Sequence, residues 1–470
     1  MLIRNAEIGI ARARLVDLRI ADGRIAAIAA HLQPRPGETV IDAGGAALLP
    51  SLHDHHLHLQ SFAAAQDSLA CGPPQLRDAE SLQQALHRRH AELGAGEWLR
   101  GVGYHESVAG DIDRDWLDRC GPARPLRIQH RSGRLWIMNS PALTALGVDN
   151  GGDVPLERDA RGRYTGRLYD ADDWLRARRP RTQPSLWAIS RRLAAHGVTG
   201  VTDTTPDNGP ETLQRFESAI AEGGLLQDVL MMGDARLDQH IGGSGAVRRG
   251  AHKFHLHDAD LPDFDALCAA IRRSHVAGRG TAFHCVSRTD LTFALAALTE
   301  AGVTPSDRIE HAGVTPPDLL GWMRELGVAV VSQPGFIAER GDAYLTDVDV
   351  DERIWLYRLR AFLDAGVTLA GSTDAPFGDA NPWKAMQAAV TRRTERGVVL
   401  GAEECLSPEQ ALDLFLMPAD LSERVVRRVQ AGAAADLCLL DRPWRQARES
   451  LHTVMPRMTF KRGLLIAGLG

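Results

Sequence analysis

Residues 46–58 read AALLPSLHDHHLH, an apolar strand-like stretch that leads directly into four histidines. Farther along, between residues 186 and 421, short apolar stretches alternate with segments of helical period, which is typical of β/α units around a parallel sheet. We interpret seven of these stretches as strands, namely a segment near residue 230 and residues 198–203, 252–258, 281–286, 308–313, 328–333 and 367–374. With residues 46–52 as the first strand there are eight, the number that closes a TIM (β/α)8 barrel.

Both ends of the chain are predicted to be β structure outside this barrel. In residues 1–48, Asp22-Gly23 is a two-residue hairpin signal, and in residues 422–470 the turn falls at Arg462-Gly463. We expect these two segments to form one small β-sandwich domain. The barrel then comprises residues 49–60 and 186–421. Residues 61–185, which are too long for a loop, are expected to form an inserted α/β subdomain after the first barrel strand.

The composition of the 470-residue chain predicts a soluble globular protein. Apolar residues make up 44% and charged residues 24%, the net charge is -6, and no apolar stretch approaches the ~18 residues of a membrane span. No basic stripe interleaved with aromatic residues is present, so neither nucleic acid nor a membrane is an expected partner. Charged residues interrupt the first stretch of the chain too early for a secretory signal peptide, which predicts a cytoplasmic location. The six cysteines form no CxxC pair, which argues against a disulfide framework and a thiolate zinc site.

The histidine run after the first strand is the first candidate metal site. Two histidines separated by one residue point to the same face of a strand and can grip one metal ion. This spacing occurs twice here, as His53/His55 and as His56/His58, and the spacing alone does not choose between them. Because barrel chemistry sits at the C-terminal ends of strands, the later pair is favoured, with Asp54 on its face. The alternative is a solvated, histidine-rich turn.

Three later strands also end in polar residues that metals accept as ligands. They are His284, His311 and Asp374. Each of these residues alone is most often structural, but imidazoles and a carboxylate arriving at one rim form a ligand set suited to zinc or a similar divalent ion.

Lys253 is unusual because only three of the 54 basic residues are lysines. In residues 252–258 it shares one strand face with His255 and His257. Burial favours the neutral amine, which can take up carbon dioxide to become a carbamate that bridges two cations. The alternatives are an exposed solubilising charge for Lys253, and a competing ligand pair formed by His255 and His257.

Residues 50–58 resemble the first-strand motif of the amidohydrolase superfamily, which reads proline, glycine, two apolar positions, aspartate, any residue and then H-x-H. The later Lys253, His284, His311 and residues 372–376 follow in the order of that pattern. Residues 139–143 resemble the branch called amidohydrolase family 3, which includes N-substituted formamide deformylases. The chain departs from the pattern at Ser51, where glycine is usual, at His53, where an apolar residue is usual, and at Arg134, where many relatives carry histidine.

The resemblance implies a divalent metal cofactor, with zinc expected and one or two ions bound. The implied ligands are His56, His58, Lys253, His284, His311 and Asp374. In this arrangement Lys253 is carboxylated and bridges if two ions bind, and the catalytic residues are Asp374, which carries the proton, and His311.

We expect an enzyme that hydrolyses a non-peptide C-N bond in a linear amide, including N-formyl and N-acyl amines, with a metal-activated hydroxide. The alternatives are a cyclic amide hydrolase or heterocycle deaminase with the same metal site, and a non-catalytic barrel scaffold. The substrate is a small molecule, and a homodimer is one expected assembly. The candidate substrate contacts are Tyr104, Arg134, Trp136, Gln333 and Arg358, although arginines are usually solvated.

Overall fold

The computed structural model describes the chain except for residues 11, 74, 149–153, 179–183, 240–244 and 469–470. It divides into two compact units, Met1–Leu59 with Leu186–Gly470, and Gln60–Ser185. A further division of the first unit into a barrel and a separate terminal domain stays a prediction. Within the described part of the chain, no helix is long and apolar enough to cross a membrane.

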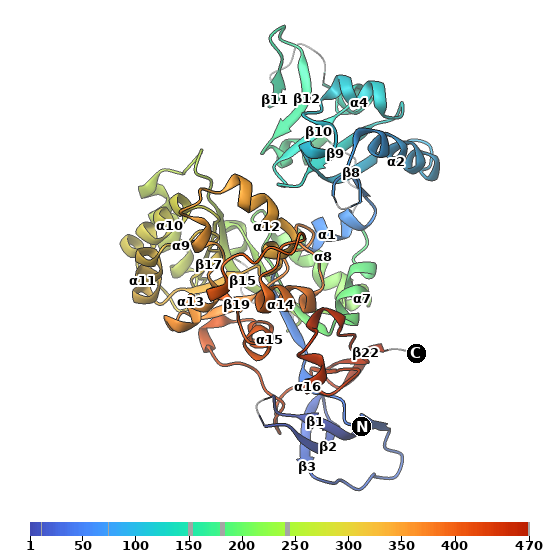
Figure 1. The fold of residues 1–470 in the computed structure, drawn as a ribbon, viewed down its shortest axis with the longest axis vertical. Helices are drawn as coiled ribbons and strands as arrows, with labels where there is room; N and C mark the ends of the chain where they lie inside the picture. The colour runs from blue at the N-terminus through green and yellow to red at the C-terminus, as the bar shows by residue number, and fades with distance from the viewer. Residues whose placement is uncertain (11, 74, 149–153, 179–183, 240–244, 469–470) are drawn as a thin grey trace. The chain divides into compact units, whose positions relative to one another are not determined.

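The first unit contains an eight-stranded sheet whose neighbouring strands are all parallel (Figure 1). In order around the sheet its strands are β6 (Leu52–Leu57), β13 (Val198–Asp203), β14 (Asp228–Gly233), β15 (Val247–His255), β16 (Thr281–Cys285), β17 (Arg308–His311), β18 (Ala329–Ser332) and β19 (Leu369–Gly371). Eight parallel strands in chain order confirm the predicted TIM barrel.

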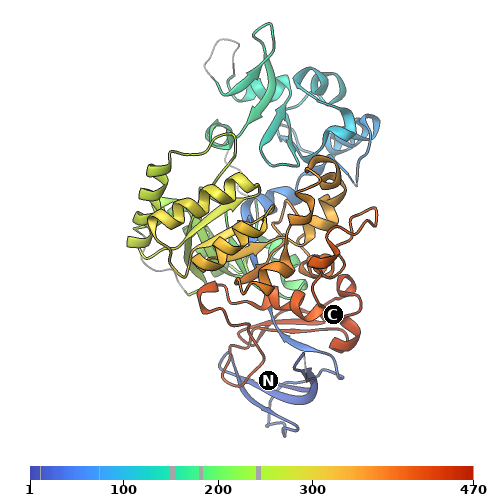
Figure 2. The same cartoon turned by 60° about the vertical axis from the view of Figure 1, so that its left-hand side comes forward.

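Helices alternate with these strands and surround them (Figure 2). They are α7 (Trp187–Ala195), α8 (Pro210–Ala221), α9 (Phe264–Val276), α10 (Arg288–Ala301), α11 (Pro317–Leu326), α12 (Gly335–Asp347), α13 (Leu359–Asp364), α14 (Pro382–Thr391) and α15 (Pro408–Leu416). Helix α10 shows why such segments are helical. Its buried Leu291, Ala294, Leu295 and Leu298 recur at helical spacing, and Ser287 begins the helix with a capping box.

The predicted first barrel strand, residues 46–52, is wrong in its boundaries. Instead, β5 (Leu48–Pro50) pairs antiparallel with β20 (Leu437–Leu439) in another sheet, and the barrel strand β6 begins only at Leu52. Pro50 has no N–H group with which to extend a ladder, so the chain changes sheets directly after it. The histidines from His53 to His56 therefore lie within the strand rather than beyond it.

Two four-stranded sheets lie at the chain ends. One has the order β3 (Arg24–Ala29), β2 (Arg14–Ala21), β1 (Leu2–Ile8) and β4 (Val40–Asp42), and the other β22 (Leu464–Gly468), β21 (Met458–Lys461), β20 and β5. Both predicted hairpin turns are confirmed, because Asp22-Gly23 and Arg462-Gly463 join paired strands with positive φ at both turn residues. One apolar cluster contains residues of both sheets, such as Leu18 and Phe460.

The second unit is built on a six-stranded sheet with helices beside it. Its strands, in spatial order, are β11 (Leu156–Arg158), β12 (Tyr164–Tyr169), β10 (Leu135–Met138), β9 (Leu126–His130), β8 (Leu99–Tyr104) and β7 (Leu69–Ala70). The helices here include α2 (Ala79–Glu92), α4 (Arg114–Cys120), α5 (Ser140–Ala145) and α6 (Asp172–Arg178).

The barrel closes between its first and last strands through a buried carboxylate. Oδ1 of Asp54 accepts from the backbone N–H of Thr373 at 3.1 Å, and Oδ2 accepts from its hydroxyl at 2.5 Å. Two backbone bonds complete the seam, from Asp374 N to His56 O at 2.8 Å and from His58 N to Ala375 O at 2.9 Å. Asp54 therefore joins the segment that carries His56 to the segment that carries Asp374.

Replacing Asp54 should open this seam. We expect Asp54→Ala to lower the free energy of unfolding by about 2–4 kcal/mol, because two buried donors of Thr373 lose their carboxyl acceptor. Urea denaturation measures the loss. Thr373→Ser keeps both donors and removes one methyl group, so it should cost only about 1 kcal/mol. Equal losses in the two variants would show that Asp54 does not close the barrel.

Candidate metal centre

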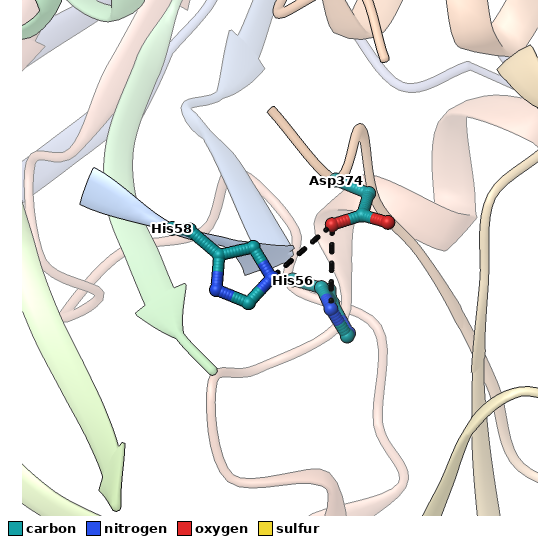
Figure 3. Close-up of side chains that lie close together, drawn as sticks. All are labelled: His56, His58 and Asp374. Carbon is teal, nitrogen blue, oxygen red and sulfur yellow. Dashed lines mark ion pairs between the residues drawn. The ribbon is translucent and has the colours of Figure 1, made fainter. Parts of the chain in front are cut away.

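Three side chains at the C-terminal mouth of the barrel offer ligand atoms within 4.8 Å of one another: His56, His58 and Asp374. Figure 3 shows both imidazoles facing the same carboxylate oxygen. Oδ1 of Asp374 lies 3.5 Å from Nε2 of His56 and 3.4 Å from Nε2 of His58. The two histidines come from the end of β6 and the aspartate from the segment after β19, so the barrel closure itself brings them together.

His56 is held in one orientation by a buried acidic residue. Its Nδ1 lies 2.5 Å from Oε2 of Glu310, and because a carboxylate can only accept, Nδ1 donates the proton. The other nitrogen, Nε2, is thereby left with its lone pair toward Asp374. Burial alone would raise the pKa of Glu310, but Arg308, Lys253 and His56 hold it well below its usual range. Glu310 therefore remains an anion that orients the imidazole of this candidate ligand.

The second histidine of the pair is oriented by a hydroxyl group. Nδ1 of His58 lies 3.0 Å from Oγ1 of Thr205, which follows β13. His58 therefore presents Nε2, like His56, to the carboxylate of Asp374.

His311 on β17 is oriented by a relay that begins in the neighbouring strands. The hydroxyl of Ser372 donates to Ser332 O at 3.2 Å and accepts from Nε2 of Gln333 at 2.9 Å. Oε1 of Gln333 therefore faces Nδ1 of His311 at 2.7 Å and receives its proton. This leaves Nε2 of His311 as an acceptor, 3.0 Å from Nδ1 of His284. His284 and His311 thus lie together beside His56, His58 and Asp374. The ring centroids of His56 and His311 are 4.8 Å apart.

Two of the candidate ligands sit in the left-handed backbone region. The φ angles are 70° at His311, the last residue of β17, and 56° at Asp374, which follows the end of β19 at Gly371 by three residues. A residue other than glycine in this backbone region destabilises the folded state by roughly 1–3 kcal/mol, and such residues cluster at functional sites.

Lys253 is buried beside this group. It is 5% exposed, and its Nζ has no hydrogen-bond partner in the described part of the chain. Burial lowers its pKa to about 8, although the nearby Glu310 opposes the shift. A buried amine with this pKa is partly neutral at physiological pH and lacks the partners that an ammonium normally needs.

The donor set fits a divalent cation. Oδ1 of Asp374 is buried without a hydrogen-bond donor among the residues described, and two imidazole nitrogens face it. Burial alone would raise the pKa of Asp374, but the surrounding His56, His58 and His311 lower it below its ordinary value. An anionic oxygen with imidazole nitrogens around it is the nitrogen and oxygen set that zinc prefers.

The remaining histidines of the two runs lie outside this group. His53 and His55 are buried within β6, with Nε2 of His53 2.9 Å from the hydroxyl of Thr202. The prediction that residues 252–258 form one strand is wrong at its end, because β15 stops at His255. His257 therefore follows the strand, although its ring remains 4.2 Å from that of His255, which in turn lies 4.3 Å from the ring of His284.

The candidate substrate contacts have other partners in the structure. Gln333 uses both ends of its amide to orient His311, so it is a positioning residue, and Nε of Arg358 donates to Glu404 at 2.9 Å. In the inserted unit, Arg134 pairs with Asp170 at 2.6 Å. Tyr104 and Trp136 are 1% and 4% exposed in apolar clusters of that unit, which leaves almost no ring surface for a substrate.

Two residues of the site were missed in the sequence. Asp54 was assigned to the ligand face but instead closes the barrel, and Glu310 was not singled out at all. The sequence did contain a signal for Glu310. Arg308 and Glu310 are two charged residues, separated by the apolar Ile309, within one short buried strand. Buried charges at that spacing must be paired.

Comparison with known proteins agrees with this geometry. Residues 39–467 match the model of the amidohydrolase family. The N-substituted formamide deformylase of Arthrobacter pascens is 26% identical over 535 aligned positions, which cover 99% of this chain and 98% of that protein. A metal-dependent hydrolase of Pyrococcus horikoshii OT3 has a TM-score of 0.76 at 19% identity, over 95% of this chain and 98% of that one. The 5-methylcytosine deaminase of Klebsiella pneumoniae has a TM-score of 0.56 at 15% identity, over 100% and 98%.

The fold and site define a barrel hydrolase that depends on a divalent metal. The chain belongs to the amidohydrolase family, in its family 3 branch, and it hydrolyses carbon-nitrogen bonds other than peptide bonds.

The contact between Glu310 and His56 should control metal affinity. We expect Glu310→Gln to weaken metal binding about 10- to 100-fold, because the amide removes the charge that orients and polarises the imidazole. Chelator competition measures the affinity. Glu404→Gln is the matched control, since Glu404 is also buried and paired with an arginine, Arg358, but forms no hydrogen bond with a histidine in the described part of the chain. A normal affinity in Glu310→Gln would argue against this role.

Proposed function

We propose that the protein hydrolyses the amide bond of a linear N-acyl amine, with an N-substituted formamide as the leading substrate class. The observation that carries this proposal is the convergence of His56, His58 and Asp374 at the mouth of the barrel. The choice of bond is supported by the nearly full-length similarity to an N-substituted formamide deformylase. In the balanced reaction, water adds to the formyl carbon, the C-N bond breaks, and formate and a primary amine leave.

The cation at this centre is proposed to be zinc, held by His56, His58 and Asp374 and, where a second ion binds, also by His284 and His311. When bound, the ion supplies Lewis-acid activation of water and of the substrate carbonyl. The protein fixes the tautomers of His56 and His311 through Glu310 and Gln333, so their Nε2 atoms are available as ligands.

Asp374 is proposed to carry the proton. Its lowered pKa keeps the carboxyl ionised, so it can accept a proton from the attacking water at Oδ2 while Oδ1 faces His56 and His58. The same proton then passes to the departing nitrogen, which is a poor leaving group without it. Because Asp374 is buried, the proton is held away from bulk solvent between these two transfers.

Lys253 is proposed to be carboxylated at Nζ. The support is its burial, the lack of a hydrogen-bond partner for Nζ, and a pKa of about 8 that leaves part of the amine neutral. Addition of carbon dioxide to that amine releases one proton and forms an anionic carbamate. The two carbamate oxygens would give this buried side chain, whose Nζ otherwise has no partner, two atoms that can bind a cation.

A substrate panel tests the reaction. We expect the metal-loaded protein to release formate and amine from N-substituted formamides, and to turn over cyclic amides and aminated heterocycles at least 100-fold more slowly. Asp374→Asn should lower kcat by about 1000-fold or more, whereas Asp379→Asn, a change in a carboxylate paired with Lys384, should leave it unchanged. Faster turnover of the cyclic substrates would replace the proposed function with ring opening or deamination.

Carboxylation of Lys253 can be detected without an activity assay. Protein equilibrated with 13C-bicarbonate should show one carbamate carbon signal by NMR, and Lys253→Ala should lose it, because the buried neutral amine is the reacting group. Lys384→Ala serves as the control, since Lys384 is exposed and paired with Asp379. A signal that persists in Lys253→Ala would place the carbamate elsewhere.

A further inference from the structure

The barrel has a pocket at the mouth opposite the metal centre. Its volume is about 210 Å³, and its wall includes Leu230, Arg248, Gly280, Arg308 and Ala329. These residues lie at or next to the beginnings of five successive parallel strands, β14 to β18. His56, His58 and Asp374 lie at or beyond strand ends, so the pocket and the metal centre are on opposite sides of the barrel core.

Four arginines line this pocket: Arg248, Arg249, Arg279 and Arg308. Two of them are neutralised, since Arg279 pairs with Asp238 and Arg308 pairs with Glu310, both at 2.5 Å. Within the described residues, Arg249 donates only to backbone oxygens, including Asp238 O at 2.8 Å and Ala277 O at 2.9 Å, which hold the guanidinium in place without cancelling its charge. Arg248 is exposed and has no carboxylate partner within the described ranges.

Among the residues that the structure describes, the acidic residues of the wall form no ion pair with Arg248 or Arg249. Asp307 is saturated by hydrogen bonds, because it accepts from Thr281 N at 2.6 Å, from the Thr281 hydroxyl at 2.8 Å, from Thr304 N at 2.7 Å and from Nε2 of His275 at 3.0 Å. Asp420 is exposed and has an interaction of its own. Two arginines of the wall are therefore without a carboxylate in contact among the described residues: Arg249, which backbone oxygens hold in place, and the exposed Arg248.

We propose that this pocket is a binding site for a small oxyanion, a phosphate or a carboxylate, held chiefly by Arg248 and Arg249. Guanidinium groups bind both classes through paired N–H donors as well as charge. The volume of about 210 Å³ admits a small anion and excludes a macromolecule. The site is separate from the hydrolytic centre and does not depend on which C-N bond the protein cleaves.

Arg308 connects the pocket to the metal centre. Its Nε donates to Oε1 of Glu310 at 2.5 Å, and Oε2 of the same carboxylate holds His56. Its Nη2 donates to His55 O at 2.8 Å. A change at Arg308 would therefore disturb a metal ligand, so Arg248, which has no such contacts, is the residue to replace.

Calorimetric titration of the metal-loaded protein with inorganic phosphate tests the proposal, at an ionic strength held constant with sodium chloride. We expect one saturable site whose affinity falls at least tenfold in Arg248→Ala and less in Arg248→Lys, which keeps the charge but loses the planar pair of donors. Arg35→Ala, a change in an exposed arginine outside the pocket, should bind like the unchanged protein. Arg248→Ala should also keep its hydrolytic activity, which shows that it is folded.

A parallel titration with acetate separates the two ligand sources. The anion whose binding depends on Arg248 identifies the class that the pocket takes. Equal affinity in Arg248→Ala and the unchanged protein would place the anion elsewhere, for instance at the metal centre, and would overturn the proposal. The absence of saturable binding for both anions would also overturn it.

Discussion

The hydrogen bond between Nδ1 of His56 and the carboxylate of Glu310 is the contact on which the site depends most. It joins strands β6 and β17 across the barrel core, and it decides which nitrogen of His56 faces Asp374. Glu310 can remain charged in the core because Arg308 pairs with its other oxygen and because Lys253 and His56 also lower its pKa. The three side chains form one buried polar network, in which loss of Glu310 or of Arg308 would leave the other without its partner of opposite charge.

The pairing of buried polar groups with one another also explains why so many of them are tolerated inside this barrel. Asp54 is satisfied by both donors of Thr373, and Gln333 is satisfied by His311 and Ser372. Each of these buried groups has a partner from a neighbouring strand. Exceptions in the barrel include Nζ of Lys253, Oδ1 of Asp374 and both ring nitrogens of His55, which lack hydrogen-bond partners among the residues that the structure describes. Of these atoms, Oδ1 of Asp374 faces Nε2 of His56 and of His58, so a bound cation would give it a partner.

Much of the fold was predictable because it rests on local patterns. The alternation of apolar strands with helical segments predicted eight parallel strands, and two glycine turns predicted the terminal hairpins. The first strand was misplaced because apolar character continues from Leu48 to Leu52, whereas the sheet changes at Pro50 for lack of an N–H group. Hydrophobicity records burial but not which sheet a buried residue joins.

The sequence alone determined which residues could serve as ligands, since H-x-H spacing, a rare lysine and polar strand ends are local features of the chain. The roles of the surrounding residues were decided only by the tertiary structure. Gln333 was expected to contact substrate and instead orients His311, Tyr104 and Trp136 lie in an apolar core, and Glu310 holds His56 from a position 254 residues away. A hydrogen bond requires two atoms within about 3 Å, and separation along the chain carries no information about which distant strand will supply the second atom.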